Sequence, residues 1–172
     1  MLVESQNLKR LKPNFFFSFL KREMLTNFDL EEMAQEYDLD LIGVFSKDKI
    51  PTKRISGDYI INLQDYEDGG GTHWVAFKIF DNKKCCYFDP FGFDCPVDVK
   101  EFLTPFRPIA YNNRVIQDIK SELCGYFCLA FLKYFKDFNS KNDVYEAYDD
   151  FLNSFSTNTK TNDKIVMEML KK

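Results

Sequence analysis

The sequence lacks the residues that several common kinds of functional site require. It contains one histidine, and its five cysteines include no Cys-x-x-Cys pair, so the spaced ligands of a structural zinc site are missing. The glycine run Gly69-Gly70-Gly71 is not followed by the Gly-Lys-Ser/Thr of a phosphate-binding loop. We therefore expect neither a metal site nor a cofactor.

Long basic runs are also absent. No run of Lys and Arg exceeds two residues, and 23 basic against 27 acidic side chains give a net charge of −4. A protein that binds DNA without regard to sequence usually presents a basic face, because neutralising phosphates supplies most of the affinity. Scattered lysines could still gather on folding, so the charge weakens the prediction of nucleic-acid binding and does not exclude it.

Long apolar runs are missing as well. The apolar segment at 15–20 is too short to cross a bilayer, is followed by charged residues, and lacks the small-residue cleavage site of a signal peptide. This pattern predicts an intracellular protein that does not insert into a membrane. The cysteines, which are odd in number, are then expected to be reduced.

What the sequence does contain is the composition of an ordinary globular domain. Hydrophobic residues make up 45% and charged residues 29% of 172 positions, and aromatic residues reach 17%. The chain has no internal repeat and no low-complexity linker. A length of this order suits one domain, so we expect a single domain over 1–172.

The order of predicted elements places strands between helices. Thr26 or Asn27 can cap the first helix, with acidic residues in its first turn. Alternation and turn residues predict strands, and three- and four-residue apolar steps predict helices. Strands are expected at 57–63, 73–80, 85–88 and 114–117, and helices at 28–36, 97–103, 124–138, 142–155 and 162–171. Helices at both ends around a block of strands indicate an α+β fold.

Cys124 and His73 are the candidate catalytic pair. Cys124 lies where the long predicted helix begins, and the positive end of a helix dipole stabilises a thiolate. A cysteine protease needs that thiolate as its nucleophile. Taken alone, each residue has a plainer interpretation, since Cys is commonly a small buried hydrophobe and a lone His is commonly a hydrogen-bonded structural residue.

The neighbourhood of His73 favours the catalytic interpretation. His73 opens a predicted hairpin whose return arm ends at Asp89, so the two ends lie side by side and Asp89 can orient the imidazole. Asp89 also suits a turn before Pro90, and Asp94 is the competing acid, which we expect to cap the helix opened by Pro96. Gln117 could supply an amide donor to an oxyanion hole with the Cys124 N–H, although it could equally be a polar loop residue.

These residues carry a resemblance to a known family. The chain resembles adenain, the adenovirus maturation protease, and the related proteases of virophages and of Polinton-type (Maverick) transposons, over most of 25–138. The matching segments are Gly71-Thr72-His73-Trp74-Val75-Ala76-Phe77, Cys86-Tyr87-Phe88-Asp89-Pro90-Phe91-Gly92-Phe93, Gln117, and Cys124-Gly125-Tyr126-Phe127-Cys128. Segment 25–51 is similar to the N-terminal part of the virophage and Polinton members.

The resemblance implies a papain-like cysteine protease fold. A central mixed β-sheet is flanked by helices, and the catalytic cysteine lies at the N-terminus of a core helix. By position, His73, Asp89, Gln117 and Cys124 take the roles of base, acidic partner, oxyanion donor and nucleophile, and Trp74 becomes a candidate wall of the substrate groove. Adenain has Glu at the acidic position, whereas Asp is used by the related proteases of ubiquitin-like proteins.

The resemblance also implies a biological role. The expected substrates are viral capsid precursor proteins cut near small residues, and the expected location is the virion and the host cell interior, at a cytoplasmic assembly site. Adenain is activated by DNA and by a capsid-derived peptide disulfide-bonded to a cysteine, but 97–116 contains no Cys. An activating peptide is thus not evident from the sequence, and DNA activation is not expected. The alternatives are a protease of ubiquitin-like modifiers and an inactive binding scaffold of the same fold.

Overall fold

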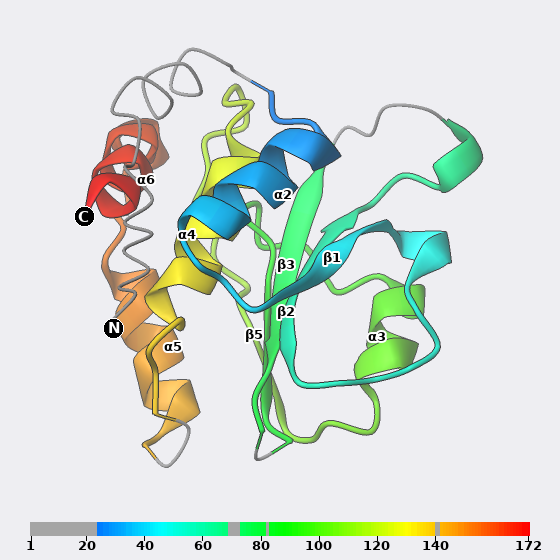
Figure 1. The fold of residues 1–172 in the computed structure, drawn as a ribbon. Coiled ribbons are helices and arrows are strands. Elements are labelled where there is room, and N and C mark those ends of the chain that lie inside the picture. The colour runs from blue at the N-terminus through cyan, green and yellow to red at the C-terminus, as the bar shows by residue number, and fades with distance from the viewer. Residues whose placement is uncertain (1–23, 69–72, 82, 140–141) are drawn as a thin grey trace, which may run out of the picture.

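The core of the molecule is a five-stranded mixed sheet in the order β1-β2-β3-β4-β5 (Figure 1). The computed structural model describes residues 24–68, 73–81, 83–139 and 142–172, so the predicted turn at 69–71 and the apolar segment at 15–20 lie outside the described residues. The central strands β2, β3 and β4 are antiparallel neighbours, while β1 and β5 join the two edges in parallel. The strands are β1 (Leu41–Ser46), β2 (Gly57–Asn62), β3 (Trp74–Ile79), β4 (Cys85–Phe88) and β5 (Ile109–Tyr111).

Helices cover both faces of the sheet. Helix α3 packs on one face, α2 and α4 lie on the other, and α5 and α6 pack beyond α4 (Figure 1). Their bounds are α2 (Asn27–Glu36), α3 (Val97–Leu103), α4 (Cys124–Tyr134), α5 (Val144–Asn153) and α6 (Asn162–Lys171), with short 3₁₀ turns at Lys47–Lys49, Tyr66–Asp68 and Thr159–Thr161. The predicted α+β class, with a central mixed sheet flanked by helices, is confirmed. In the described part of the chain, none of the helices is long and apolar enough to cross a bilayer.

Alternation along the strands divides the core into two parts. Phe77 of β3 contributes to the cluster under α3, whereas its neighbour Ala76 contributes to the cluster under α4. Cys85 and Cys86 divide in the same way and are both completely buried, as expected for packing residues. Successive side chains of β3 and β4 point to opposite faces of the sheet, and both faces are buried.

Helix α4 is the central helix of the larger cluster. Its residues from Cys124 to Leu132 are all buried, so it is surrounded on every side, although three- and four-residue apolar steps are typical of a helix with one buried face. It ends at Tyr134 and not at Phe138, because the chain then continues through the three-residue turn bonds Lys136 N to Lys133 O and Phe138 N to Phe135 O. Those turns keep Phe135 buried, which explains why the apolar spacing continues past the end of the helix.

The strand predicted at 114–117 is wrong. The N–H groups of Ile116 and Gln117 both donate to the carbonyl of Pro90, at 2.9 Å each, so this segment packs on the loop after β4 and joins no ladder. The edge strand is instead β5, at Ile109–Tyr111. Strand β1 was not predicted at all; its pairing with β2 contains an irregularity between Leu41 and Gly43.

A buried ion pair crosses from β2 to β3. Asp58 and Lys78 are cross-strand partners, and Lys78 Nζ donates to Asp58 Oδ1 at 2.6 Å, with the two side chains 1% and 11% exposed. Burial raises the pKa of Asp58, and the charge of Lys78 counteracts only part of that rise. The pair is thus costly to separate, because either partner alone would be a poorly solvated charge.

Lys78→Met is expected to lower the free energy of unfolding by about 3 kcal/mol, since it leaves the Asp58 carboxylate buried without its cation. Urea denaturation near neutral pH measures this change. The double variant Asp58→Leu with Lys78→Met should recover most of the loss, because an apolar pair of similar volume leaves no charge behind. Unchanged stability in Lys78→Met would show that the ion pair is not needed.

Candidate active site

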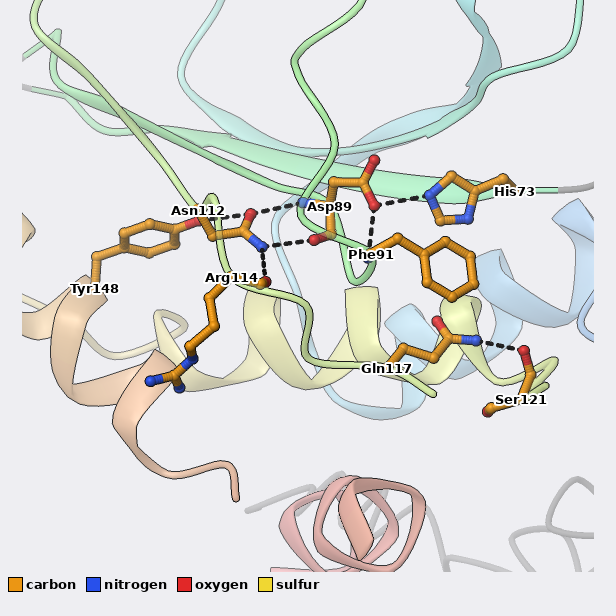
Figure 2. A network of polar contacts seen from close by, with 8 residues as sticks. All are labelled: His73, Asp89, Phe91, Asn112, Arg114, Gln117, Ser121 and Tyr148. Atoms are coloured by element: carbon orange, nitrogen blue, oxygen red, sulfur yellow. Dashed lines mark hydrogen bonds and ion pairs between the residues drawn. The ribbon is translucent and has the colours of Figure 1, made fainter. Parts of the chain in front are cut away.

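His73 and Asp89 meet at one end of the central hairpin. His73 directly precedes β3 and Asp89 directly follows β4, and the antiparallel register that pairs Ala76 with Phe88 brings these two ends together. His73 Nε2 lies 2.8 Å from Asp89 Oδ1 (Figure 2). Because an ionised carboxylate can only accept, Nε2 carries the proton of this bond. Asp89 is completely buried and the His73 side chain is 12% exposed.

Two further contacts fix the geometry of this pair. Asp89 Oδ1 also accepts from the N–H of Phe91 at 2.8 Å, which anchors the carboxylate to its own turn. The Phe91 ring then stacks on the imidazole, with ring centroids 4.8 Å apart and an angle of 29° between the planes. Phe91 was part of the sequence motif, but its contact with His73 could not be predicted from spacing. The imidazole is held by its edge and by its face.

Cys124 is the first residue of α4 and is 7% exposed. Leu123 occupies the N-cap position, where no side chain caps the helix, and the first turn contains no acidic residue. The positive end of the helix dipole is therefore directed at the thiol without a competing anion from its own first turn. Gly125 follows because the helix start is crowded: a Cβ there would lie 3.2 Å from Leu25 Cδ1 and 3.1 Å from Leu30 Cδ2.

The imidazole interacts with both Asp89 and Cys124. Burial by itself lowers the pKa of His73, but hydrogen bonding and charge from Asp89, together with those from Cys124, outweigh it and raise the pKa from 6.5 to about 9. Since Nε2 is bonded to Asp89, Nδ1 is the nitrogen that remains for the thiol; it is buried and has no hydrogen-bond partner among the described residues. A ring that stays protonated at neutral pH stabilises a thiolate beside it.

Gln117 is completely buried, and both its backbone and its side chain are hydrogen-bonded. Its backbone N–H donates to the carbonyl of Pro90 at 2.9 Å, which places it beside the turn that carries Asp89. Its side-chain Nε2 donates to the carbonyl of Ser121 at 2.7 Å, within the segment that leads into α4 (Figure 2). That contact uses one amide proton and leaves the second for a ligand. Ser121 was not singled out from the sequence.

Trp74 is the first residue of β3 and lines a cavity. It is 7% exposed, and its indole N–H donates to the carbonyl of Leu25 at 3.1 Å. It lines one side of a cavity of about 520 Å³, which is also lined by Thr26, Asn27, Val44, Phe45, Ser46, Lys49, Asn62, Gln64, Asp65 and Tyr66. Because Trp74 follows His73 directly, this cavity is a candidate place for substrate residues near the scissile bond.

The role predicted for Asp94 is wrong. Asp94 is exposed, and α3 begins after Pro96 without any side-chain cap. The turn after β4 therefore brings Asp89 to His73 and leaves Asp94 at the surface.

Comparison with known proteins shows the fold. No protein-family model matches the chain, and no curated protein matches its sequence. The crystal structure of the ASFV pS273R protease is similar to this chain with a TM-score of 0.55 and 16% sequence identity, over 86% of this chain and 66% of that one. The central domain of the uncharacterized Lpg1148 protein from Legionella pneumophila has a TM-score of 0.47 and 11% identity, over 87% and 95% of the two chains.

The likeness to the ASFV protease confirms the predicted papain-like cysteine protease fold. The chain thus has the fold of a viral cysteine protease, and it spans about two thirds of the length of that protease. At this level of identity the likeness establishes the fold alone. The narrower resemblance to adenain rests on the sequence motifs, and the comparisons do not test it.

Proposed function

We propose that residues 1–172 form a single cysteine endopeptidase domain with Cys124 as its nucleophile. The observation that carries this proposal is the hydrogen bond of His73 Nε2 to the buried Asp89 carboxylate, together with a raised His73 pKa to which Asp89 and Cys124, at the start of the central helix, both contribute. A thiol, a base and a group that orients the base form the recurring arrangement of nucleophilic catalysis. The fold of a viral cysteine protease supports it.

Each residue has a defined step in the proposed reaction. The Cys124 thiolate attacks the scissile carbonyl carbon, and the Cys124 N–H and the free amide proton of Gln117 stabilise the oxyanion, at about 3 kcal/mol per donor. His73 then protonates the leaving amine, which leaves a thioester on Cys124. Neutral His73 next removes a proton from water, and the hydroxide attacks the thioester, which releases the carboxyl product and restores the Cys124 thiolate beside protonated His73. Asp89 orients the ring throughout.

The proposed substrates are viral capsid precursor proteins cut near small residues. The support is the sequence resemblance to maturation proteases, and the cavity beside Trp74 provides room for substrate side chains. With such substrates the enzyme would act in the virion and at the assembly site inside the host cell.

Incubation of the purified chain with the capsid proteins encoded beside it, followed by N-terminal sequencing of the fragments, tests this function. We expect discrete cleavage after small residues, which the variants Cys124→Ala and His73→Ala do not produce. Cleavage of ubiquitin-like modifiers but not of capsid proteins would replace the substrate assignment and keep the mechanism. Absence of cleavage of either, with intact folding, would favour the inactive scaffold.

Duplex DNA is not expected to activate the enzyme strongly. The net charge of −4 and the absence of long basic runs leave little to neutralise a row of phosphates. The measurement is the rate of peptide cleavage with and without duplex DNA at low salt, where phosphate contacts are strongest. Stimulation of about tenfold that disappears at high salt would contradict this expectation.

A further inference from the structure

The pairing of β4 with β5 ends next to the proposed catalytic carboxylate. The last backbone pair of this ladder joins Tyr87 to Tyr111, and Asn112 follows directly. From this point the Asn112 side chain contacts Asp89, which directly follows β4. Its Oδ1 accepts from the N–H of Asp89 at 3.0 Å, and its Nδ2 donates to the carbonyl of Asp89 at 2.6 Å (Figure 2). One amide side chain thus binds both polar groups of the Asp89 main chain, as a neighbouring strand would.

The remaining contacts of Asn112 fix its orientation. The second Nδ2 proton goes to the carbonyl of Arg114 at 3.2 Å, and the residue is only 4% exposed. The N–H of Asp89 requires an acceptor and the two carbonyls require donors, so only one placement of the amide oxygen and nitrogen satisfies all three. A carboxylate could not donate to either carbonyl. An asparagine is therefore required here by hydrogen bonding.

A side chain of helix α5, Tyr148, contacts the Asn112 amide. Tyr148 is only 2% exposed; its hydroxyl donates to the carbonyl of Tyr87 at 2.6 Å and lies 3.3 Å from Asn112 Oδ1. Because a hydroxyl has one proton, the shorter bond to Tyr87 is the principal one. The guanidinium of Arg114 donates to the carbonyl of Leu152 near the end of α5. The segment that carries Asn112 is thus tied to α5 at two points, of which Figure 2 shows the contact of Tyr148 with Asn112.

The Asp89 carboxylate depends on its main chain for direction. Its Oδ1 contacts His73 and the Phe91 N–H, while its Oδ2 is buried without a hydrogen-bond partner in the part of the chain that the structure describes. No other described side chain holds the carboxylate. A rotation of the Asp89 peptide would accordingly swing the carboxylate away from the imidazole.

We propose that Asn112, backed by Tyr148, is a positioning residue that holds the Asp89 peptide so that its carboxylate meets His73. Asn112 touches no reacting atom and acts through Asp89. Its effect on catalysis rests on the function proposed above, whereas its effect on the His73–Asp89 contact does not. The two can therefore be tested separately.

The single histidine of the chain makes this test direct. The ring signals of His73 in NMR spectra titrate without interference from another histidine, so its pKa can be measured in each variant. In Asn112→Ala we expect the His73 pKa to fall by about one unit towards its ordinary value, because a displaced carboxylate stabilises the imidazolium less. We also expect kcat to fall on the order of tenfold with little change in KM.

Asn162→Ala is the matched control. Asn162 is completely buried and binds the N–H and carbonyl of Ser156 with its side-chain amide, at 2.9 and 3.0 Å, just as Asn112 binds Asp89. Loss of its hydrogen bonds should destabilise the fold comparably without moving the His73 pKa. If Asn112→Ala does not fold, Tyr148→Phe removes only the supporting hydroxyl and should shift the His73 pKa in the same direction by less.

A double variant separates positioning from general destabilisation. In an Asp89→Asn background, Asn112→Ala should cause little further loss of kcat, because the carboxylate through which it acts is gone. Equal losses in both backgrounds, or an unchanged His73 pKa in folded Asn112→Ala and Tyr148→Phe, would overturn the proposal. If the wild-type chain cleaves no substrate, the proposed function fails, and the titration still decides whether Asn112 positions Asp89.

Discussion

Cys124→Ala is expected to abolish peptide cleavage, with a loss of kcat of at least about 10⁴-fold. The proposed reaction passes through a thioester on Cys124, and alanine offers no atom that can form it. The fold should survive, because the change removes one sulfur atom from a site that is already 7% exposed. Cleavage of a fluorogenic peptide measures the loss, with circular dichroism to show that the variant is folded.

The other cysteines provide the controls for this variant. Cys128 lies one helical turn further along α4, and burial raises its pKa well above the usual range, so it stays a neutral thiol. Burial likewise raises the pKa of Cys85 and of Cys95 to about 12 and that of Cys86 well above its usual value. Alanine at any of these four positions should preserve kcat. Substantial activity in Cys124→Ala would contradict the assignment of the nucleophile.

Asp89→Asn is expected to lower kcat by about 10- to 1,000-fold while the protein stays folded. Asparagine keeps an oxygen that can accept from His73 and from the Phe91 N–H, so the geometry can survive while the charge is lost. Loss of the triad acid lowers kcat by up to about 10⁴-fold in serine proteases. In the proposed mechanism the imidazolium is already paired with a thiolate, so kcat should depend less on the acid. Steady-state kinetics of the folded variant measures the effect.

The pH profile of the same variant provides a second, independent measurement. The His73 pKa is raised from 6.5 to about 9, so the protonated ring that must protonate the leaving amine is present at neutral pH and is lost as pH rises through about 9. The stability that the protonated ring gains from Asp89 and Cys124 is likewise complete below about pH 6.5 and is lost on the way to pH 9. In Asp89→Asn the His73 pKa and the alkaline fall in activity should both move to lower pH.

Asp94→Asn is the control for this pair of measurements. Asp94 follows Asp89 on the same connection but is exposed at the surface, so its loss should leave both kcat and the alkaline limb close to those of the wild type. A larger loss of kcat at Asp94 than at Asp89 would reverse the assignment of the acidic partner.

The parts of the site that local patterns determine could be predicted from the sequence. A hairpin brings its two ends together whatever its surroundings, so the alternation along β3 and β4 was enough to predict that Asp89 can reach His73. The apolar spacing after Cys124 similarly located the start of α4. These patterns depend on short-range geometry, which a single segment contains in full.

The parts that depend on distant segments could not be predicted. Strand β5 is three residues long, and β1 is irregular, so each is recognisable only by its partner strand in the sheet. In the sequence Asn112 is an ordinary polar residue after Tyr111; its role arises because the fold brings its side chain to the N–H and carbonyl groups of Asp89. The segment 114–117 has the composition of a strand, but the N–H groups of Ile116 and Gln117 donate to the carbonyl of Pro90 and not to a neighbouring strand.

The rate of alkylation of each cysteine by iodoacetamide at about pH 6, followed by mass spectrometry, tests the pairing of Cys124 with His73 most directly. The account predicts that Cys124 reacts faster than a free cysteine at this pH, that the four other cysteines react slowly, and that His73→Ala removes the advantage of Cys124. A Cys124 that reacts no faster than a free cysteine, or whose rate is unchanged in folded His73→Ala, would contradict it.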